Sequence, residues 1–242
     1  MAIVNDPARK RTAAEIGEYF DGEVERFSDL ARGQASIKDA RLMMDLFAET
    51  APVLVPRARS ILDLGCGAGN QTLNLLRAFP DADCTLLDLS SAMLERAAER
   101  VGSVASGRVT LVEGDLRSAP LPGGSFDVVV AAAVLHHLRS DAEWTSVFAR
   151  IRRLLKDGGV LLVSDLIRHE NPAVEAVFKV RHEAFLRGAL GDAEAERIMR
   201  SIAASDTPSP LEYQFGVLNK LGFREVALLH KDLVFGAYYA LK

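Results

Sequence analysis

The stretch ILDLGCGAGN, residues 61–70, places three glycines within five positions directly after an apolar run. Glycine loses more backbone freedom on folding than any other residue, so such a cluster indicates a special turn or a close approach to the main chain. A turn of this kind between a strand and a helix lies at the carboxyl end of a parallel sheet, where open α/β sheets bind ligands. The free N–H groups of the following helix favour an anionic group. We therefore expect a ligand to lie against residues 65–69.

Downstream of this turn, short apolar strands alternate with amphipathic helices, which is typical of a parallel sheet covered on both faces. Two final strands are joined by only two residues, which requires an antiparallel pair. The pattern predicts an α/β fold: a Rossmann-like, doubly wound, mostly parallel seven-stranded sheet that ends in an antiparallel hairpin. The strands are predicted at 60–64, 84–89, 108–114, 126–133, 160–166, 223–230 and 233–241.

Helices are predicted at both ends of this core. Near the N-terminus, apolar residues recur at helical spacing from Ile16 to Phe27, and Ser36 with Asp39 forms a start signal for a second helix. After the fourth strand, Ser140 and Glu143 predict a capping box, and the sequence KDGG at 156–159 is expected to end that helix. A further helical insertion precedes the hairpin, with a helix from Asn171 to Gly191, a short one at 193–203 and a third that starts at Ser209 and ends at Gly222.

Composition limits the class of protein. The 242 residues include 29 basic and 33 acidic ones, for a formal net charge of −4, which disfavours a nucleic-acid binder held by phosphate neutralisation. The longest apolar run, residues 128–135, is too short for a membrane span, and the segment 1–15 lacks the apolar core of a signal peptide. Cys66 and Cys84 lack the spacing of a zinc site, so no metal is expected. We expect a cytoplasmic protein without direct nucleic-acid or membrane partners.

Two acidic residues follow the second and third predicted strands. Asp88 lies about 20 residues beyond the glycine turn, where a carboxylate can accept both ribose hydroxyls of a nucleoside. Asp115, in EGDL, can accept a hydrogen bond from the exocyclic amine of adenine, with Leu116 beside the ring. Either acid alone could be only a helix cap. Together with the glycine turn, the two acids predict a nucleoside site.

The form of the turn distinguishes between nucleoside cofactors. A dinucleotide fingerprint is G-x-G-x-x-G/A, but Asn70 occupies its third small position here, and the glycines follow G-x-G-x-G. The segments ILDLGCGAGN, LLDLS, VEGDL, FDVVVAAAVLHHL and LLKDGGVLLVSDL resemble, in order and approximate spacing, the class I S-adenosylmethionine-dependent methyltransferases. The resemblance covers residues 59–166 and the layout of the final hairpin. It implies that the cofactor is S-adenosyl-L-methionine.

The resemblance also implies roles for individual residues. Gly65, Gly67 and Gly69 would lie under the methionine part of the cofactor, with Cys66 as a small buried filler of the same turn. The remaining roles would be Asp63 for the ammonium group, Asp88 for the ribose, Leu89 for packing on adenine, Asp115 and Leu116 for the adenine edge, and Ala132 near the sulfonium. We expect a single domain over 1–242, with a helical cap at 1–55, a cofactor-binding core at 59–166, a helical substrate lid at 167–222 and a closing hairpin at 223–242.

Methyl transfer needs little acid–base chemistry, because the sulfonium already activates the methyl group. His136 and His137 follow the fourth strand, and one of them, with His137 as the candidate, could deprotonate an oxygen or nitrogen nucleophile. The alternative is that both histidines only orient the loop or pack. The substrate is expected to be a small molecule held by the N-terminal helices and the insertion. Candidate polar groups there are Arg181, His182, Arg200 and Tyr213, and an arginine would suit a carboxylate or phosphate; each is equally typical of a solvated helix.

Two alternatives to a small-molecule methyltransferase stay open. The layout is similar to carboxy-S-adenosylmethionine synthase, which makes a carboxylated cofactor for tRNA wobble-uridine modification and whose carboxylate-binding arginine would fall at Arg200. The sequence departs from that enzyme at Gly67, where serine is expected, and at Ala132, where asparagine is expected. The other alternative is a non-catalytic cofactor-binding regulator, for which we would expect an eroded glycine turn. Apolar positions in the helical insertion are compatible with a homodimer.

Overall fold

The computed structural model describes residues 10–242. The start of the predicted helical cap and most of the segment assessed for a signal peptide, residues 1–9, lie outside the described part of the chain. Within residues 10–242, no helix is both long and apolar enough to cross a membrane.

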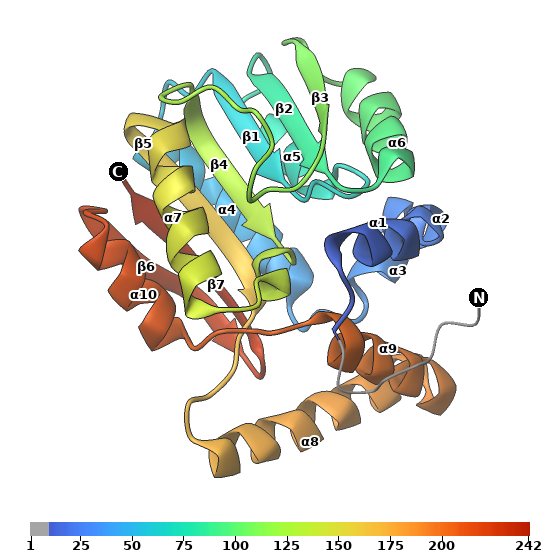
Figure 1. Ribbon diagram of the computed structural model, residues 1–242. Helices are drawn as coiled ribbons and strands as arrows, with labels where there is room; N and C mark the ends of the chain where they lie inside the picture. The colour runs from blue at the N-terminus through green and yellow to red at the C-terminus, as the bar shows by residue number, and fades with distance from the viewer. Residues whose placement is uncertain (1–9) are drawn as a thin grey trace.

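Seven strands of the described chain form one sheet, in the order β3-β2-β1-β4-β5-β7-β6 (Figure 1). The neighbours from β3 to β5 run parallel, whereas β7 lies antiparallel between β5 and β6. The predicted mostly parallel sheet with a terminal hairpin is therefore confirmed. The strands are β1 (Ser60–Leu64), β2 (Asp83–Asp88), β3 (Val109–Glu113), β4 (Phe126–Ala132), β5 (Leu155–Leu166), β6 (Glu225–Asp232) and β7 (Phe235–Leu241).

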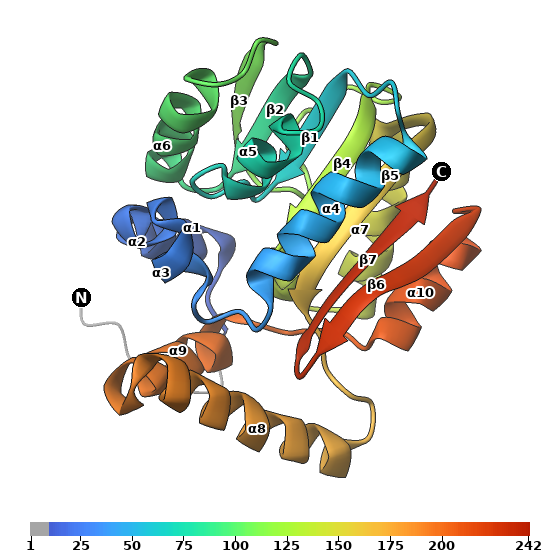
Figure 2. The ribbon, with the colours of Figure 1, turned by 180° about the vertical axis from the view of Figure 1, so that it is seen from behind.

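Helices cover both faces of the sheet (Figure 2). On one face lie α4 (Ala40–Leu54), α5 (Asn70–Leu76) and α6 (Ser91–Gly102), and on the other lie α7 (Asp141–Leu154) and α10 (Leu211–Lys220). Each face has its own apolar core: Phe47 and Leu75 are fully buried in the first, and Phe148 and Leu218 in the second. The central strands β1, β4 and β5 are buried on both sides, which explains why they are apolar at consecutive positions, whereas the edge strands β3 and β6 are more exposed.

The remaining helices lie beyond the carboxyl ends of the parallel strands (Figure 1). One of them, a 3₁₀ turn, comes from the loop after β4, and the others come from the two segments that were expected to cover the site, the N-terminal region and the insertion before the hairpin. They are α1 (Ala13–Asp21), α2 (Val24–Ser28), α3 (Leu30–Gln34), the single 3₁₀ turn η1 (Leu135–His137), α8 (Pro172–Leu190) and α9 (Asp192–Ser205).

The N-terminal helices depart from the prediction. The helical spacing from Ile16 to Phe27 is divided between α1 and α2, and the helix start predicted at Ser36 is wrong. The helix α4 begins at Ala40, after Asp39 in a left-handed conformation with φ of 56° and no side-chain cap. The carboxylate of Asp39 is engaged elsewhere, because it accepts hydrogen bonds from His230 (3.1 Å) and from its neighbour Lys38 (3.4 Å).

The boundaries of α7 also differ in part. The Ser140 hydroxyl accepts a hydrogen bond from the N–H of Glu143 as predicted, but the Glu143 carboxylate accepts from the N–H of Arg139 rather than completing the capping box. The helix ends at Leu154, before KDGG. Residues 156–159 lie in β5, whose register with β4 shifts there, and Lys156 is anchored by donating to Asp127 of β4 at 2.8 Å.

The later boundaries agree more closely with the sequence. Asn171 caps α8, and Gly191 follows its last residue, as predicted. The hairpin has a two-residue connection, but it lies at 233–234 rather than 231–232. The third helix of the insertion starts at Leu211, without a side-chain cap from the preceding residues.

Candidate active site

A cavity of about 520 Å³ lies at the carboxyl ends of the strands, within the size range of small-molecule sites. The loops after β1 to β4 and the end of β5 form its floor, and the N-terminal region, α8 and α9 form its cover. Among the predicted site residues, the cavity is lined by Asp63, Gly65, Cys66, Gly67, Asp88, Leu89, Asp115, Leu116, Ala132, His136, His137 and His182. The fold thus gathers residues from five strand ends around one space.

The three glycines of the turn have different tasks. All have positive φ, at 67° for Gly65, 49° for Gly67 and 81° for Gly69. A Cβ atom on Gly65 would come within 2.5 Å of Val134, and one on Gly69 within 2.9 Å of Val101, whereas nothing lies within 4 Å of the corresponding position on Gly67. Gly69 lies outside the cavity lining, and the packing of α5 against α6 requires a glycine there; its contact with the cofactor stays a prediction. The open space at Gly67 belongs to the cavity.

Asn70 occupies the position at which a dinucleotide fingerprint has a small residue, and its side chain has a structural role. Its amide donates a hydrogen bond to the main-chain oxygen of Phe27 (2.9 Å), and its carbonyl accepts one from Arg100 (2.8 Å). The residue therefore connects the glycine turn to α2 on one side and to α6 on the other. This link positions the N-terminal helices over the cavity.

Asp63, at the carboxyl end of β1, is almost completely buried beneath the cavity. Burial raises its pKa to about 7, although the Thr72 hydroxyl donates a hydrogen bond to it at 2.7 Å. A buried carboxylate with one neutral partner favours a cationic group nearby. Cys66, beside it, is also buried, and burial raises the pKa of its thiol, with Asp88 and Asp63 acting in the same direction. The thiol therefore stays protonated, as the sequence led us to expect.

Asp88 connects the end of β2 to the glycine turn. One carboxylate oxygen accepts a hydrogen bond from the N–H of Gly67 (2.8 Å), and the other accepts one from the N–H of Ser90 (3.0 Å). Burial raises the pKa of this carboxyl despite these hydrogen bonds. Each oxygen can accept a further hydrogen bond, so the side chain can bind two hydroxyl groups of a ligand. Leu89 lies next to it on the cavity wall.

Asp115, after β3, is held by an arginine that the sequence analysis did not single out. Arg117 donates to both carboxylate oxygens, at distances of 2.6–3.0 Å, and its main-chain N–H donates to one of them at 2.8 Å. Burial alone would raise the pKa of Asp115, but the hydrogen bonds from Arg117 outweigh it and lower that pKa. The carboxylate is therefore fixed in its charged form, with Leu116 buried beside it.

His136 belongs to a buried network at the end of β5. Its Nδ1 is hydrogen-bonded to Asp165, whose other oxygen accepts from the main-chain N–H groups of Val134, Leu135 and His136. On the other side of the ring, Nε2 lies 3.6 Å from Asp206. Burial would lower the pKa of His136, but the charges of Asp165 and Asp206 raise it to about 9. At neutral pH this imidazole is protonated and serves the architecture of the loop.

His137 has the opposite character. Its Nδ1 lies 3.2 Å from the main-chain oxygen of Ser205, which can only accept a hydrogen bond, so Nδ1 carries the proton. Its Nε2 is buried and has no hydrogen-bond partner among the described residues. Burial and the neighbouring charge of His136 lower the pKa of His137 well below its usual value. His137 is therefore a neutral imidazole that lines the cavity, and the lone pair of its Nε2 is buried and unpaired among the described residues.

His136, His137 and Asp206 each bring one possible ligand atom within 4.8 Å of the others, a spacing that a metal ion could bridge. The surrounding charges oppose a dication, because Lys10 and Arg139 act electrostatically on Asp206 and His136 is itself protonated. We interpret these residues as a proton and charge network rather than as a metal centre.

Three predicted substrate residues do not reach the cavity. Arg200 is 72% exposed and lies 3.7 Å from Glu196, Arg181 is exposed on α8, and the Tyr213 hydroxyl donates to the main-chain oxygen of Asp141 at 3.0 Å. The structure therefore does not bring these three side chains to the cavity, and helical periodicity could not show which polar face of the insertion turns inward. The cavity is also lined by four residues that no sequence motif marked, Lys10, Arg11, Tyr19 and Arg139. The basic run before α1 was the available signal.

Comparison with known proteins agrees with this geometry. Residues 61–159 match the model of a methyltransferase domain family. The C-methyltransferase UbiE of ubiquinone and menaquinone biosynthesis from Syntrophotalea carbinolica is 30% identical over 229 residues, which cover 93% of this chain and 92% of that protein. This chain belongs to the class I S-adenosylmethionine-dependent methyltransferases. The resemblance noted from the five sequence segments is therefore confirmed, and the methyltransferase uses S-adenosyl-L-methionine.

Other relatives show how far the similarity extends. Carboxy-S-adenosyl-L-methionine synthase from Shewanella baltica is 27% identical over the full length of both chains. Trans-aconitate 2-methyltransferase from Paracidovorax citrulli is 34% identical over 148 residues, and the aligned part spans 61% of this methyltransferase but only 54% of that relative. Human N-acetylserotonin methyltransferase, solved in complex with S-adenosylmethionine, shares the fold with a TM-score of 0.60 at 18% identity; the match covers 96% of this chain and 57% of that one.

The residues of the cavity fit the cofactor. The space above Gly67 would be filled by any side chain, the carboxylate of Asp88 has free acceptor capacity, and buried Asp63 favours a cation. A nucleoside with an attached amino group presents the complementary chemistry.

Proposed function

We propose that this methyltransferase transfers the methyl group of S-adenosylmethionine to an oxygen, nitrogen or carbon atom of a small molecule. The main observation that supports this proposal is that one cavity contains two chemically distinct halves. The glycine turn with Asp63, Asp88 and Asp115 forms one half, and His137 with a set of cationic side chains lies in the other. A cofactor and an acceptor can therefore lie side by side in one cavity.

The cofactor half is assigned by the chemistry of its residues. Asp88 would accept from the two ribose hydroxyls, and the carboxylate of Asp63 would balance the ammonium group. Asp115, with Leu116 and Leu89 at the ring, would hold the adenine. Gly67 would lie under the methionine part and Ala132 near the sulfonium. When bound, S-adenosylmethionine supplies a methyl group on a positively charged sulfur, which is the reactive chemistry of the site.

The protein contributes positioning and removal of a proton. Holding an acceptor in line with a reactive group can lower a barrier by roughly 7–11 kcal/mol, so the rigid loop at the end of β4 supplies much of the catalysis. Where the acceptor must lose a proton, we assign His137 Nε2 as the proton acceptor. The proposal is supported by the hydrogen bond from Nδ1 to the main-chain oxygen of Ser205, which fixes the orientation of the ring and leaves Nε2 buried without a partner among the described residues.

Carboxy-S-adenosylmethionine synthase is the second candidate, and its support is the full-length similarity to the Shewanella enzyme. The residue expected to bind the extra carboxylate, Arg200, lies outside the cavity, and Ala132 offers no polar side chain to such a group. A purely regulatory cofactor-binding protein has less support, because the glycine turn and its three acids are intact.

The direct test supplies the purified protein with S-adenosylmethionine labelled in its methyl group and an extract of small metabolites. We expect the label in one or a few small molecules, identified by mass spectrometry, with formation of S-adenosylhomocysteine. Label found only in RNA or protein, or none at all, would contradict the proposal. The mass of the ligand that copurifies with the protein separates the two candidates, because the synthase would retain a carboxylated cofactor.

We also propose a cytoplasmic location, which the free and buried state of Cys66 and Cys84 supports. For assembly we propose a homodimer, without direct nucleic-acid or membrane partners. Its support is the row of exposed valines on α8, Val174, Val177 and Val180, which are 40%, 54% and 68% exposed. Sedimentation of the purified protein tests that assembly.

A further inference from the structure

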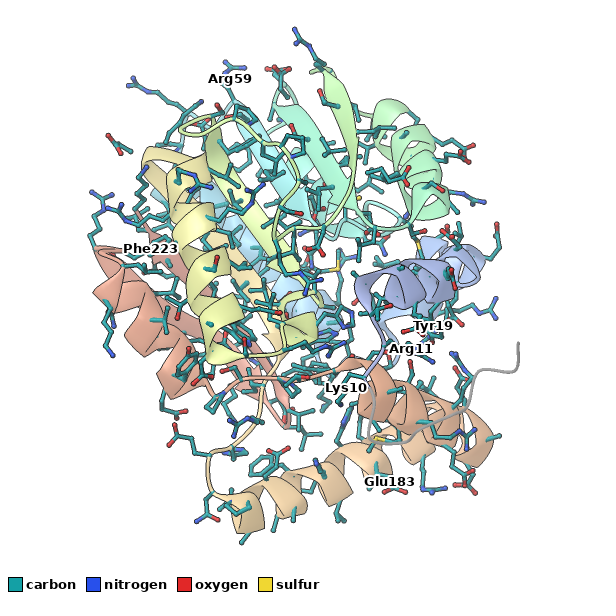
Figure 3. The ribbon with its side chains drawn as sticks, viewed as in Figure 1. Lys10, Arg11, Tyr19, Arg59, Glu183 and Phe223 are labelled. Carbon is teal, nitrogen blue, oxygen red and sulfur yellow. The ribbon has the colours of Figure 1, made fainter. Side chains whose placement is uncertain are left out.

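Three cationic side chains gather in the substrate half of the cavity. Lys10 and Arg11 come from the segment before α1, and Arg139 comes from the loop before α7. Figure 3 shows Lys10 and Arg11 close to Tyr19 where α1 approaches α9, and the guanidinium of Arg11 lies over the Tyr19 ring at 4.6 Å. Lys10 and Arg11 are neighbours in the sequence, but Arg139 lies 128 residues beyond Arg11, so the fold brings it to them.

Their hydrogen bonds go to neutral oxygens. Lys10 donates to the main-chain oxygens of Ala203 and Asp206, both at 2.6 Å, and Arg11 donates to the hydroxyls of Ser201 and Ser205 at 3.2 and 2.8 Å. Arg139 donates to the main-chain oxygens of Ser205 and Arg11 and to the Thr207 hydroxyl. None of the three forms an ion pair with a carboxylate of residues 10–242. By contrast, Arg26 and Arg117, which line the same cavity, pair with Glu23 and Asp115.

The neighbouring carboxylates do not neutralise this cluster. Asp206 acts electrostatically on Lys10 and Arg139, but its carboxylate lies 3.6 and 3.4 Å from His136 and His137, so its single charge is shared among these groups. Asp165 is bound to His136. Glu143 acts on Arg139 but is paired with Arg117, and Lys179 adds further positive charge beside Lys10. Since His136 is itself protonated, four positive groups in this half of the cavity face two carboxylates.

Partial burial makes this excess charge unfavourable in the empty site. Burial lowers the pKa of Lys10 and of Arg139, which shows that both charges are partly removed from water. A charge removed from water without a charged partner is unfavourable, and an anionic ligand supplies the missing partner. Arginine is well suited to this purpose because its guanidinium binds a carboxylate or phosphate with two parallel hydrogen bonds.

We propose that the methyl acceptor carries an anionic group, a carboxylate or a phosphate, which binds between Lys10, Arg11 and Arg139. This inference rests on the proposed function, because it places the acceptor in the half of the cavity that the cofactor does not fill. The anion is anchored at the α9 side of the cavity, and the nucleophilic atom of the same molecule extends toward His137 and Ala132. Positive potential from the three cations also draws the substrate into the cavity.

The test uses the full chain saturated with S-adenosylhomocysteine and two probe anions, citrate and inorganic phosphate, each titrated by calorimetry. We expect at least one anion to bind the wild type, more weakly as sodium chloride is added, and the tighter of the two identifies the group as carboxylate or phosphate. Lys10→Met and Arg11→Met should each weaken that binding about tenfold, and Arg11→Lys, which keeps the charge, should restore part of it. The matched control is Arg200→Met, which removes an exposed charge from α9 and should leave anion binding unchanged.

Several outcomes would overturn the proposal. The first is that neither anion binds the wild type. The second is that the Lys10 and Arg11 variants, although their thermal unfolding is unchanged, bind the anions as tightly as the wild type does. A loss of affinity for S-adenosylhomocysteine in the same variants would also overturn it, because the cations would then hold the cofactor's own carboxylate. If the proposed function itself is wrong, the wild type does not bind S-adenosylhomocysteine. Anion binding is then measured in the protein without S-adenosylhomocysteine, so the two failures can be distinguished.

Discussion

The carboxylate of Asp88 accepts a hydrogen bond from the main-chain N–H of Gly67 at 2.8 Å, and so connects the end of β2 to the glycine turn after β1. This bond holds the turn open toward the cavity and turns the remaining acceptor sites of Asp88 to the same space. The acid and the glycine therefore act as one structural unit. Two motifs that are separate in the sequence form one cradle in the fold.

A methyl group on Gly67 should block the cofactor without unfolding the protein. In Gly67→Ala, the new Cβ meets no protein atom within 4 Å and enters the cavity. We expect affinity for S-adenosylmethionine to fall at least tenfold, with a loss of about 1–2 kcal/mol in unfolding free energy because φ is positive. Gly124→Ala is the matched control, since Gly124 has φ of 61° and equally open surroundings outside the cavity. Equal cofactor affinity in the two variants would contradict the placement of Gly67 at the ligand.

Cofactor affinity should depend on pH through Asp63. Burial raises the pKa of this carboxyl to about 7, so it becomes protonated as the pH falls below that value and no longer balances the cofactor's ammonium group. We expect affinity to fall by a factor approaching ten per pH unit below about pH 7, since one proton is taken up. In Asp63→Asn, affinity should be lower near pH 8 and nearly independent of pH below 7. Calorimetry across this range is the measurement, and a flat wild-type profile would count against the assignment.

The pKa values of the two adjacent histidines should be shifted in opposite directions. Burial and the charge of His136 lower the pKa of His137, whereas Asp165 and Asp206, acting against burial, raise the pKa of His136 to about 9. Nitrogen–proton NMR correlations should show His137 neutral, with its proton on Nδ1, at pH 6.5 and above, while His136 loses its proton only near pH 9. His137→Gln serves to assign the signals, and His169→Gln, whose Nε2 is also buried and unpartnered among residues 10–242, is the control. A proton on Nε2 of neutral His137 would exclude it as the proton acceptor.

The His136–Asp165 pair should stabilise the fold in a pH-dependent way. Because the folded pKa of His136, about 9, lies above its usual 6.5, this stability is fully present below pH 6.5 and is lost as the pH rises through 9. Asp165→Asn should lower the unfolding free energy by a constant amount, because its main-chain hydrogen bonds are weakened, and by a further pH-dependent amount that disappears over that range. The net shift of His136, to which Asp206 also contributes, corresponds to roughly 3 kcal/mol. Denaturant unfolding between about pH 6 and 10 checks this. The control is Asp127→Asn, at the opposite end of the sheet, which should destabilise the protein equally at about pH 6 and about pH 10. If Asp165→Asn also destabilised it equally at these two pH values, the proposed coupling between His136 protonation and stability would be refuted.

The cofactor half of the cavity could be predicted from the sequence because the sequence features that indicate it are local. Glycines that need positive φ, acids directly after apolar strands and the two-residue hairpin each depend on a few neighbouring residues. Asp63, Gly67, Asp88 and Asp115 accordingly line the cavity as expected. Gly69 could not be distinguished from its neighbours, because its requirement comes from contact with Val101, far along the chain.

The substrate half could not be predicted in the same way. Which face of α8 and α9 turns inward depends on their packing over the N-terminal region, and both helices carry charge around much of their circumference. Arginine was the expected residue type for an anion, but Arg181 and Arg200 face solvent. Lys10, Arg11 and Arg139 meet at the cavity only through hydrogen bonds to main-chain and hydroxyl oxygens of residues 201–207, a tertiary arrangement that no short motif encodes.

Binding of S-adenosylmethionine to Asp88→Ala, measured by calorimetry beside the wild type, tests the cradle most directly. Asp83→Ala, at the exposed opposite end of the same strand, is the control and should bind like the wild type. Removal of two hydrogen bonds to a charged acceptor predicts that Asp88→Ala binds at least about a hundredfold more weakly, with its fold retained. An Asp88→Ala variant that binds S-adenosylmethionine as tightly as the wild type would show that the cofactor lies elsewhere.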